Sequence, residues 1–233
     1  MYVSTKTNIN RSVFSSINSN DNIVEPSKCV KNLGVMFDEH LSMACQVNTI
    51  CKSVNFHLHN LWRIRKYLDR KSTERVVHAI ISSRLDYGNA LLYGIPMYML
   101  NKLQRLQNNA ARLVTLSPKM CHVNPLLVDL HWLPVIERIN YKVLLTVFKA
   151  LNGLGPSYIS ELLVPYKPAR SLRSSGKGLL FIPKARLKCF GDKCFSTYAP
   201  KLWNSLPLAL RNAASVSIFK DKLKTFLFTR HYS

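Results

Sequence analysis

Acidic residues are scarce in this sequence of 233 residues. It has 12 Asp and Glu against 33 Lys and Arg, which gives a formal net charge of +21 at neutral pH. Hydrophobic residues still make up 47% of the chain. That is enough to build a core, and it excludes a disordered basic tail and a collagen-like fibre. The charge excess favours a polyanionic partner, with RNA or DNA backbone as the leading class. The alternative is a basic structural protein of the ribosomal or chromatin type.

Long apolar runs are also absent. No stretch approaches the roughly 18 apolar residues of a membrane span, and the polar start MYVSTKTNINRS lacks the apolar core of a signal peptide. We therefore expect an intracellular protein, nuclear or cytoplasmic, that is neither secreted nor transmembrane. A peripheral membrane binder is a further alternative. It is disfavoured because the basic faces lack the Trp and Phe insertion side of interfacial helices.

Patterns that support catalysis are missing as well. Two-metal nucleotidyl transfer needs carboxylates that converge on the ions, and the only adjacent acidic pair is Asp38-Glu39. The glycines form neither a phosphate-binding loop nor a dinucleotide fingerprint. His131 beside Trp132 has no neighbouring nucleophile or acid in the sequence, so we interpret this pair as part of a structural aromatic cluster. We expect no enzymatic activity from this chain by itself, no cofactor and no small-molecule substrate.

The six cysteines are too few for a disulfide scaffold in a chain of this length. Two groups of close residues suggest zinc, but neither contains a CxxC or HxxxH pair. These groups are Cys189 with Cys194, and Cys45 and Cys51 with His57 and His59. We therefore expect reduced, unligated cysteines and no metal site.

The positive charge is concentrated in two segments. Residues 51–120 have 12 basic and 3 acidic side chains, and residues 167–233 have 14 and 2. Residues 1–50 and 121–166 are each neutral. Two basic segments flanking a neutral, apolar middle suggest nucleic-acid-facing elements on either side of a core-forming segment.

Periodicity predicts the elements of the first half. Alternating Leu33, Val35 and Phe37 predict one strand over residues 30–38, and residues 1–28 leave room only for short strands. From Leu41 the period becomes helical, with an apolar stripe that continues for about seven turns to Leu68. On the opposite face a basic stripe lies within about 40° of Lys52 at 100° per residue. Its members are Lys52, His59, Arg63, Lys66 and Arg70. A solvated basic face is the alternative interpretation.

Three further helices are predicted before residue 164. The first begins at Thr73, the second covers residues 98–115 and adds basic Lys102, Arg105 and Arg112, and the third covers residues 135–151. Pro134 and Gly153 bracket the third, as helix punctuation requires. Residues 156–163 can form one more short helix.

The last third changes in composition. Residues 165–178 combine Pro, Gly and Ser with four basic residues and no acid, which is typical of a basic linker or loop. Short strands are predicted at 179–183 and 187–190, and Ser217 is the expected N-cap of a final helix. The linker offers a second, flexible contact stripe for nucleic acid, formed by Lys167, Arg170, Arg173 and Lys177.

Six phrases, in order, carry a resemblance. They are VKNLGVMFDEHLSM (30–43), SRLDYGNALLYGIP (83–96), LQRLQNNAARLV (103–114), LHWLPVIERINYKV (130–143), FGDKCFSTYAPKLWNSLP (190–207) and FKDKLKTFLF (219–228). Together they resemble the C-terminal part of the reverse transcriptase of non-LTR (LINE-type) retrotransposons, in particular the jockey-like and chicken-repeat-like groups. The resemblance covers the chain from about residue 28 onward.

The predicted helices and strands give a mainly α fold with a small β contribution (α+β), and the resemblance implies how its parts are placed. Residues 1–40 would be a palm-end β segment, 41–164 a helical thumb-like bundle, 165–178 the linker and 179–233 a C-terminal extension. The catalytic aspartates and their Mg²⁺ would belong to a palm that this truncated chain lacks. We expect a non-catalytic fragment that binds nucleic-acid backbone. The alternatives are an inert remnant of a retrotransposon gene, or one part of a complete RNA-directed DNA polymerase.

Overall fold

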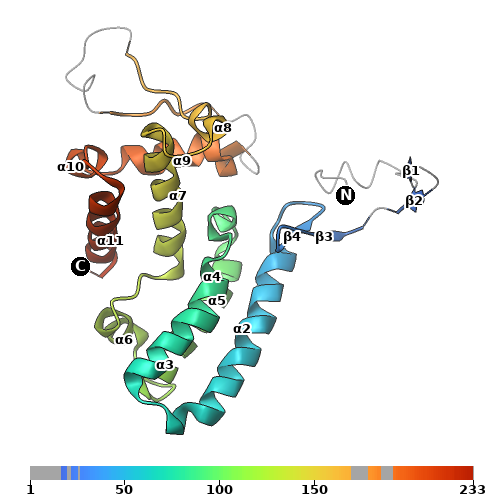
Figure 1. Cartoon of the computed structure of the whole chain (residues 1–233), viewed down its shortest axis with the longest axis vertical. Coiled ribbons are helices and arrows are strands. Elements are labelled where there is room, and N and C mark those ends of the chain that lie inside the picture. The colour runs from blue at the N-terminus through green and yellow to red at the C-terminus, as the bar shows by residue number, and fades with distance from the viewer. Residues whose placement is uncertain (1–16, 20–21, 26, 169–177, 185–190, 233) are drawn as a thin grey trace. The chain divides into compact units, whose positions relative to one another are not determined.

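A computed structural model describes residues 17–19, 22–25, 27–168, 178–184 and 191–232 (Figure 1). The described chain is mainly helical with short strands, which confirms the predicted fold class. It divides into two compact units, one formed by residues 1–88 and 95–121 and the other by residues 89–94 and 122–233. No helix in these described ranges has the length and apolar character needed to cross a membrane.

Unit 1 contains two antiparallel hairpins followed by helices. The hairpins pair β1 (Ile17–Ser19) with β2 (Asn22–Val24), and β3 (Cys29–Asn32) with β4 (Val35–Asp38). The helical elements are α2 (Ala44–Ile64), η1 (Arg65–Tyr67), α3 (Arg70–Val77), the π-helical turn η2 (His78–Ser82), α4 (Ser83–Asp86) and α5 (Met97–Thr115).

The single strand predicted over residues 30–38 is wrong, because the chain reverses in its middle. Asn32 pairs with Val35, and Leu33 and Gly34 between them have φ angles of 45° and 83°. Positive φ at both central residues is the geometry of the tight hairpin turns that match strand twist. Leu33 is consequently 86% exposed instead of buried, while Val35 packs into the core.

The predicted seven-turn helix is also shorter than expected. The α-helical part ends at Ile64, and Asp69 caps the next helix by accepting hydrogen bonds from the backbone N–H groups of Lys71 (3.2 Å) and Ser72 (3.4 Å). The second helix therefore begins at Arg70 and not at Thr73. An N-cap aspartate satisfies N–H groups that have no partner within the helix, and this stabilises a new start.

Cys29 and Cys45 form a disulfide that joins β3 to the first turn of α2. The expectation of reduced cysteines is therefore wrong for this pair. The hairpin, which was not predicted, brings the two residues together. Among the described residues Cys51, Cys121 and Cys194 are free, and no three His, Cys, Asp or Glu side chains gather as metal ligands.

Unit 2 contains η3 (Asn89–Leu92), α6 (Val123–Asp129), α7 (Val135–Leu151), α8 (Ser157–Ser160), η4 (Gly191–Lys193), α9 (Phe195–Asn204), α10 (Leu208–Arg211) and α11 (Val216–Tyr232). The predicted bounds of α7 are confirmed, and Gly153 follows it with a positive φ of 68°. The N-cap of α11 is Ser215 and not Ser217, because the Ser215 hydroxyl accepts from Ile218 N–H at 3.3 Å.

One apolar core joins α7 to the C-terminal helices. The rings of Phe148 and Phe219 stack with centroids 4.2 Å apart, and Trp203 lies 6.1 Å from Phe219. His131 is 5.9 Å from Phe228, in an aromatic contact. The boundaries of the two units therefore differ from the predicted segments 41–164 and 179–233, because α7 shares one core with helices beyond residue 179. Of the strands predicted there, Leu180 forms one bridge with Pro165, and residues 187–190 lie outside the described ranges.

Candidate nucleic-acid interface

The exposed face of α2 contains three of the predicted contact residues. Lys52, His59 and Arg63 are exposed, whereas Val54, Leu58 and Leu61 on the opposite side are buried. The spacing of seven and four residues returns to the same side of the helix at 100° per residue. The basic stripe is therefore present on α2 from Lys52 to Arg63.

The two remaining members of the predicted stripe lie outside α2. Lys66 is in η1, where its ammonium lies 4.9 Å from the centre of the Tyr67 ring. Arg70 is the first residue of α3. A continuous stripe from Lys52 to Arg70 is thus wrong, because the helix on which it was predicted ends at Ile64.

Of the second predicted stripe, only one residue lies within the part of the chain that the structure describes. Lys167 is exposed. Arg170, Arg173 and Lys177 lie outside the described residues, so the stripe stays a prediction.

Arg65, which sequence periodicity did not single out, ties the end of α2 to the end of α5. This side chain is 6% exposed. Its Nε donates to the carbonyl oxygen of Leu113 (2.8 Å) and its Nη2 to that of Val114 (2.9 Å), while Nη1 donates to Leu68. Because α2 and α5 pack against each other and residues at their C-terminal ends meet, the two helices run parallel.

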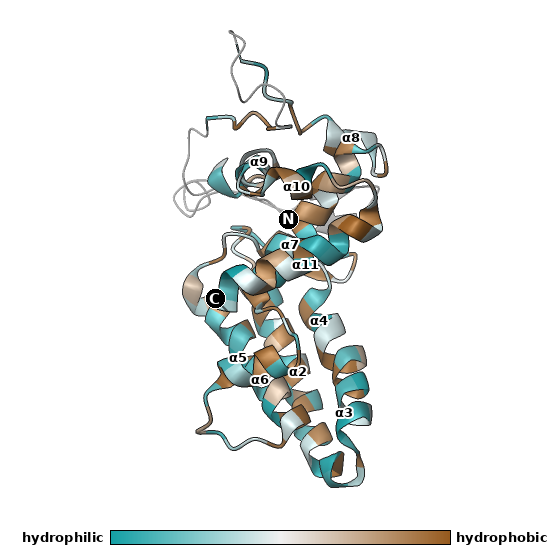
Figure 2. Ribbon diagram, turned by 90° about the vertical axis from the view of Figure 1, so that its left-hand side faces the viewer, coloured by the Kyte–Doolittle hydropathy of each residue, from teal (hydrophilic) through white to brown (hydrophobic). Residues whose placement is uncertain are grey.

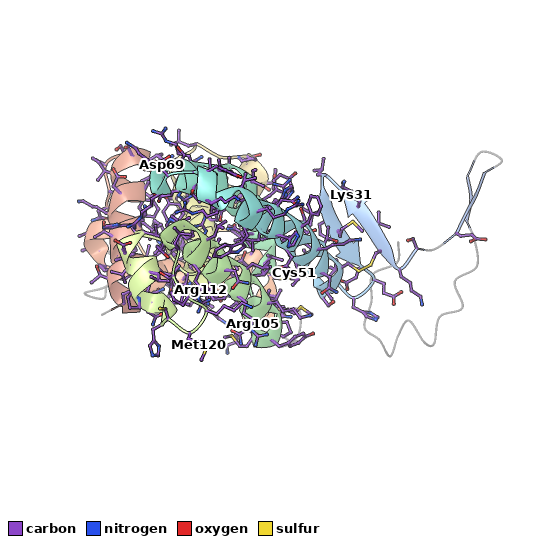
Figure 3. All side chains as sticks on the ribbon, turned by 90° about the horizontal axis from the view of Figure 1, so that it is seen from below. Lys31, Cys51, Asp69, Arg105, Arg112 and Met120 are labelled. Atoms are coloured by element: carbon purple, nitrogen blue, oxygen red, sulfur yellow. A yellow bond between two sulfur atoms is a disulfide. The ribbon has the colours of Figure 1, made fainter. Side chains whose placement is uncertain are left out.

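The neighbouring helix α5 adds a second basic stripe. Lys102, Arg105, Asn109 and Arg112 follow at intervals of three, four and three residues on one side of the helix. Burial raises the pKa of the Cys51 thiol on α2, and the positive charge of Lys102 acts in the opposite direction. This influence places Lys102 beside α2. Figure 3 labels Arg105 and Arg112 on α5 and Cys51 on α2.

Neither α2 nor α5 contains an acidic residue. We call their joint basic surface the α2–α5 face, defined by Lys52, His59 and Arg63 from α2 and by Lys102, Arg105 and Arg112 from α5. Figure 2 shows hydrophilic residues interrupting the apolar ones along both helices. The sequence indicated positive charge on each helix, but the pairing of the two stripes depends on Arg65 and the helix packing.

A hollow of about 660 Å³ lies between the C-terminal halves of the two helices. Its walls come from α2, α5 and the segment that follows α5. The lining residues are Asn55, Leu58, His59, Trp62, Asn109, Arg112, Leu116, Ser117, Pro118 and Lys119. Two members of the α2–α5 face, His59 and Arg112, therefore also line a concave site.

The adjacent acidic pair lies elsewhere and has a structural role at Asp38. Its Oδ1 accepts hydrogen bonds from the backbone N–H groups of Ser42 (2.8 Å) and His40 (3.2 Å). Burial raises the pKa of Asp38, but these hydrogen bonds outweigh burial and hold it below its ordinary value. The carboxylate thereby fixes the turn between β4 and α2.

No protein-family model matches this chain, and no curated protein or solved structure matches it either.

Proposed function

We propose that this protein binds nucleic-acid backbone electrostatically, with little sequence preference, through the α2–α5 face. The observation that carries the proposal is the pairing of two parallel helices that bear Lys52, Arg63, Lys102, Arg105 and Arg112 and contain no acid. The side chains of Lys52, Arg63, Lys102 and Arg105 are exposed, so their cations are available to phosphates. Neutralising phosphates releases condensed counterions, which drives this kind of binding.

The dimensions of the face suit a strand of nucleic acid. Lys52 and Arg63 are eleven residues apart, which at about 1.5 Å per residue is about 16 Å along the helix. Lys102 and Arg112 cover a similar length on α5. At a rise of about 3.4 Å per nucleotide, each helix can follow about five phosphates.

We further propose that the chain is the non-catalytic C-terminal part of a reverse transcriptase-like protein. The support for this origin is the six ordered phrases that resemble non-LTR retrotransposon sequences. Reading the genomic sequence upstream of Met1 tests it. A reading frame, intact or decayed, that encodes an aromatic-x-Asp-Asp motif is expected, and unrelated sequence there would contradict it.

Charge reversal on the face tests the binding proposal. We expect the triple variant Lys52→Glu, Arg63→Glu and Lys102→Glu to lose roughly 100-fold in affinity for a labelled oligonucleotide at about 50 mM salt, because phosphate contacts dominate affinity. Fluorescence anisotropy measures the affinity.

The matched control reverses the same number of charges on exposed positions of α11. Lys220→Glu, Lys222→Glu and Lys224→Glu together change the net charge by the same amount. We expect this control to lose less than roughly fivefold, since only the long-range field changes. Equal losses of affinity in the two triple variants would show that net charge, and not the α2–α5 face, drives binding. Unaltered affinity in the face variant would also overturn the proposal.

A further inference from the structure

The apolar and aromatic side chains in the hollow beside the α2–α5 face suit a flat, uncharged ring. Leu58, 4% exposed, contributes a buried apolar side chain, and Leu116 and Pro118 add apolar surface. Trp62 lines the same hollow with 44% of its surface exposed. An exposed tryptophan on an apolar cavity provides a stacking surface for an aromatic ligand.

The segment after α5 closes one side of the hollow. Leu116 has a left-handed φ of 55° and its N–H donates to the Arg112 carbonyl, as does the N–H of Ser117 at 3.2 Å. The Arg112 Nη2 in turn donates to the carbonyl oxygen of Cys121 at 3.2 Å. Arg112 thus holds this segment in place. Its buried Nε has no hydrogen-bond partner among the residues that the structure describes.

Polar groups around the hollow suit the two parts of a nucleotide. The basic side chains of Arg112 and Lys119 line it and can attract a phosphate. The amide side chains of Asn55 and Asn109 also line it, and amides can both donate to and accept from the edge of a base.

We infer that this hollow receives one unpaired nucleobase, stacked on Trp62, from a single-stranded nucleic acid whose backbone lies on the α2–α5 face. This inference rests on the proposed function. The volume of about 660 Å³ lies within the range of about 300 to 1,000 Å³ that is usual for small-ligand sites. A base in an intact duplex has both faces covered by its neighbours and does not enter the hollow. The site therefore makes the protein prefer single strands to duplex.

The fluorescence of Trp62 provides the test. The chain has three tryptophans, and Trp132 and Trp203 are only 4% and 3% exposed. Quenching by an oligonucleotide therefore reports Trp62. We expect oligothymidylate to quench the fluorescence of the whole protein. An abasic oligomer of the same length should bind through its phosphates without quenching, and a duplex of equal length should also leave the fluorescence unchanged.

Two single variants identify the stacking residue. We expect Trp62→Ala to lower affinity for oligothymidylate about tenfold, the size of one lost stacking contact, and to leave affinity for the abasic oligomer unchanged. Phe56→Ala removes another exposed aromatic side chain of α2, one that does not line the hollow, and should change neither affinity. Trp62→Phe keeps a stacking ring and should retain most of the oligothymidylate affinity.

The outcomes separate this inference from the proposed function. Binding of all three ligands without quenching, or equal effects of Trp62→Ala on oligothymidylate and abasic oligomer, would overturn base stacking and leave backbone binding standing. Absence of binding to any of the three ligands at about 50 mM salt would overturn both.

Discussion

Arg65 has an unusual environment for an arginine. It is buried, and its guanidinium donates three hydrogen bonds to backbone carbonyl oxygens, two of them at the C-terminal end of α5. The last carbonyl groups of a helix have no partners within it and form the negative end of the helix dipole. A planar, permanently charged fork can satisfy several of them at once, which an ammonium cannot.

We expect Arg65→Met to lower the free energy of unfolding by about 3 kcal/mol, because it leaves buried carbonyl groups without donors. Arg65→Lys keeps the charge but loses the fork, and should cost about 2 kcal/mol. The control is Arg63→Met on the exposed face, with an expected change under about 0.5 kcal/mol. Urea unfolding followed by circular dichroism measures all three. A loss for Arg65→Met no larger than for the control would contradict the tie between α2 and α5.

At the scale of single elements, the turn between β4 and α2 depends on Asp38. This side chain is 8% exposed and accepts from two backbone N–H groups that precede α2. Such bonds to a carboxylate are stronger than bonds to a neutral acceptor. Of the adjacent acidic pair, Asp38 therefore has a structural role, because its carboxylate fixes this turn.

We expect Asp38→Asn to lower the free energy of unfolding by about 1 kcal/mol at pH 7, because a neutral amide accepts more weakly. The pKa of Asp38 is lower in the folded protein than its ordinary value of 3.8. Its stabilising contribution is therefore fully present above that value and is lost as the pH falls through the folded pKa. Denaturant unfolding between pH 7 and pH 3 measures the effect. The gap between Asp38→Asn and wild type should narrow on acidification, and a constant gap would contradict this role.

Residues that act within their own segment predicted the bounds of several elements. Features that depend on the path of the chain beyond that segment were not predicted. The bounds of α7 follow from Pro134 and Gly153, which act within the chain segment itself. The β3–β4 hairpin was missed because alternation of apolar residues looks the same in one strand as across a tight turn at Leu33-Gly34. The end of α2 was missed because the segment from Arg65 to Asp69 contains neither Gly nor Pro. The N-cap potential of Asp69 was its only local signal.

At the scale of the whole molecule, half of the candidate site was predictable. The stripe Lys52, His59 and Arg63 follows from helical periodicity alone. The stripe on α5 is also periodic. Which helices pack together, and in which direction, depends on contacts between distant parts of the sequence, such as the one between Arg65 and Leu113, 48 residues later. The hollow at Trp62 depends on the same packing, so the sequence contained no sign of it.

The central claim is that phosphates bind the cations of the α2–α5 face. It is tested most directly by the salt dependence of affinity for a single-stranded oligonucleotide, measured by anisotropy between about 50 and 300 mM salt. If about six phosphates are neutralised, the logarithm of the association constant should fall against the logarithm of salt concentration with a slope of about −4. A slope shallower than about −1, or no binding at about 50 mM salt, would contradict the claim.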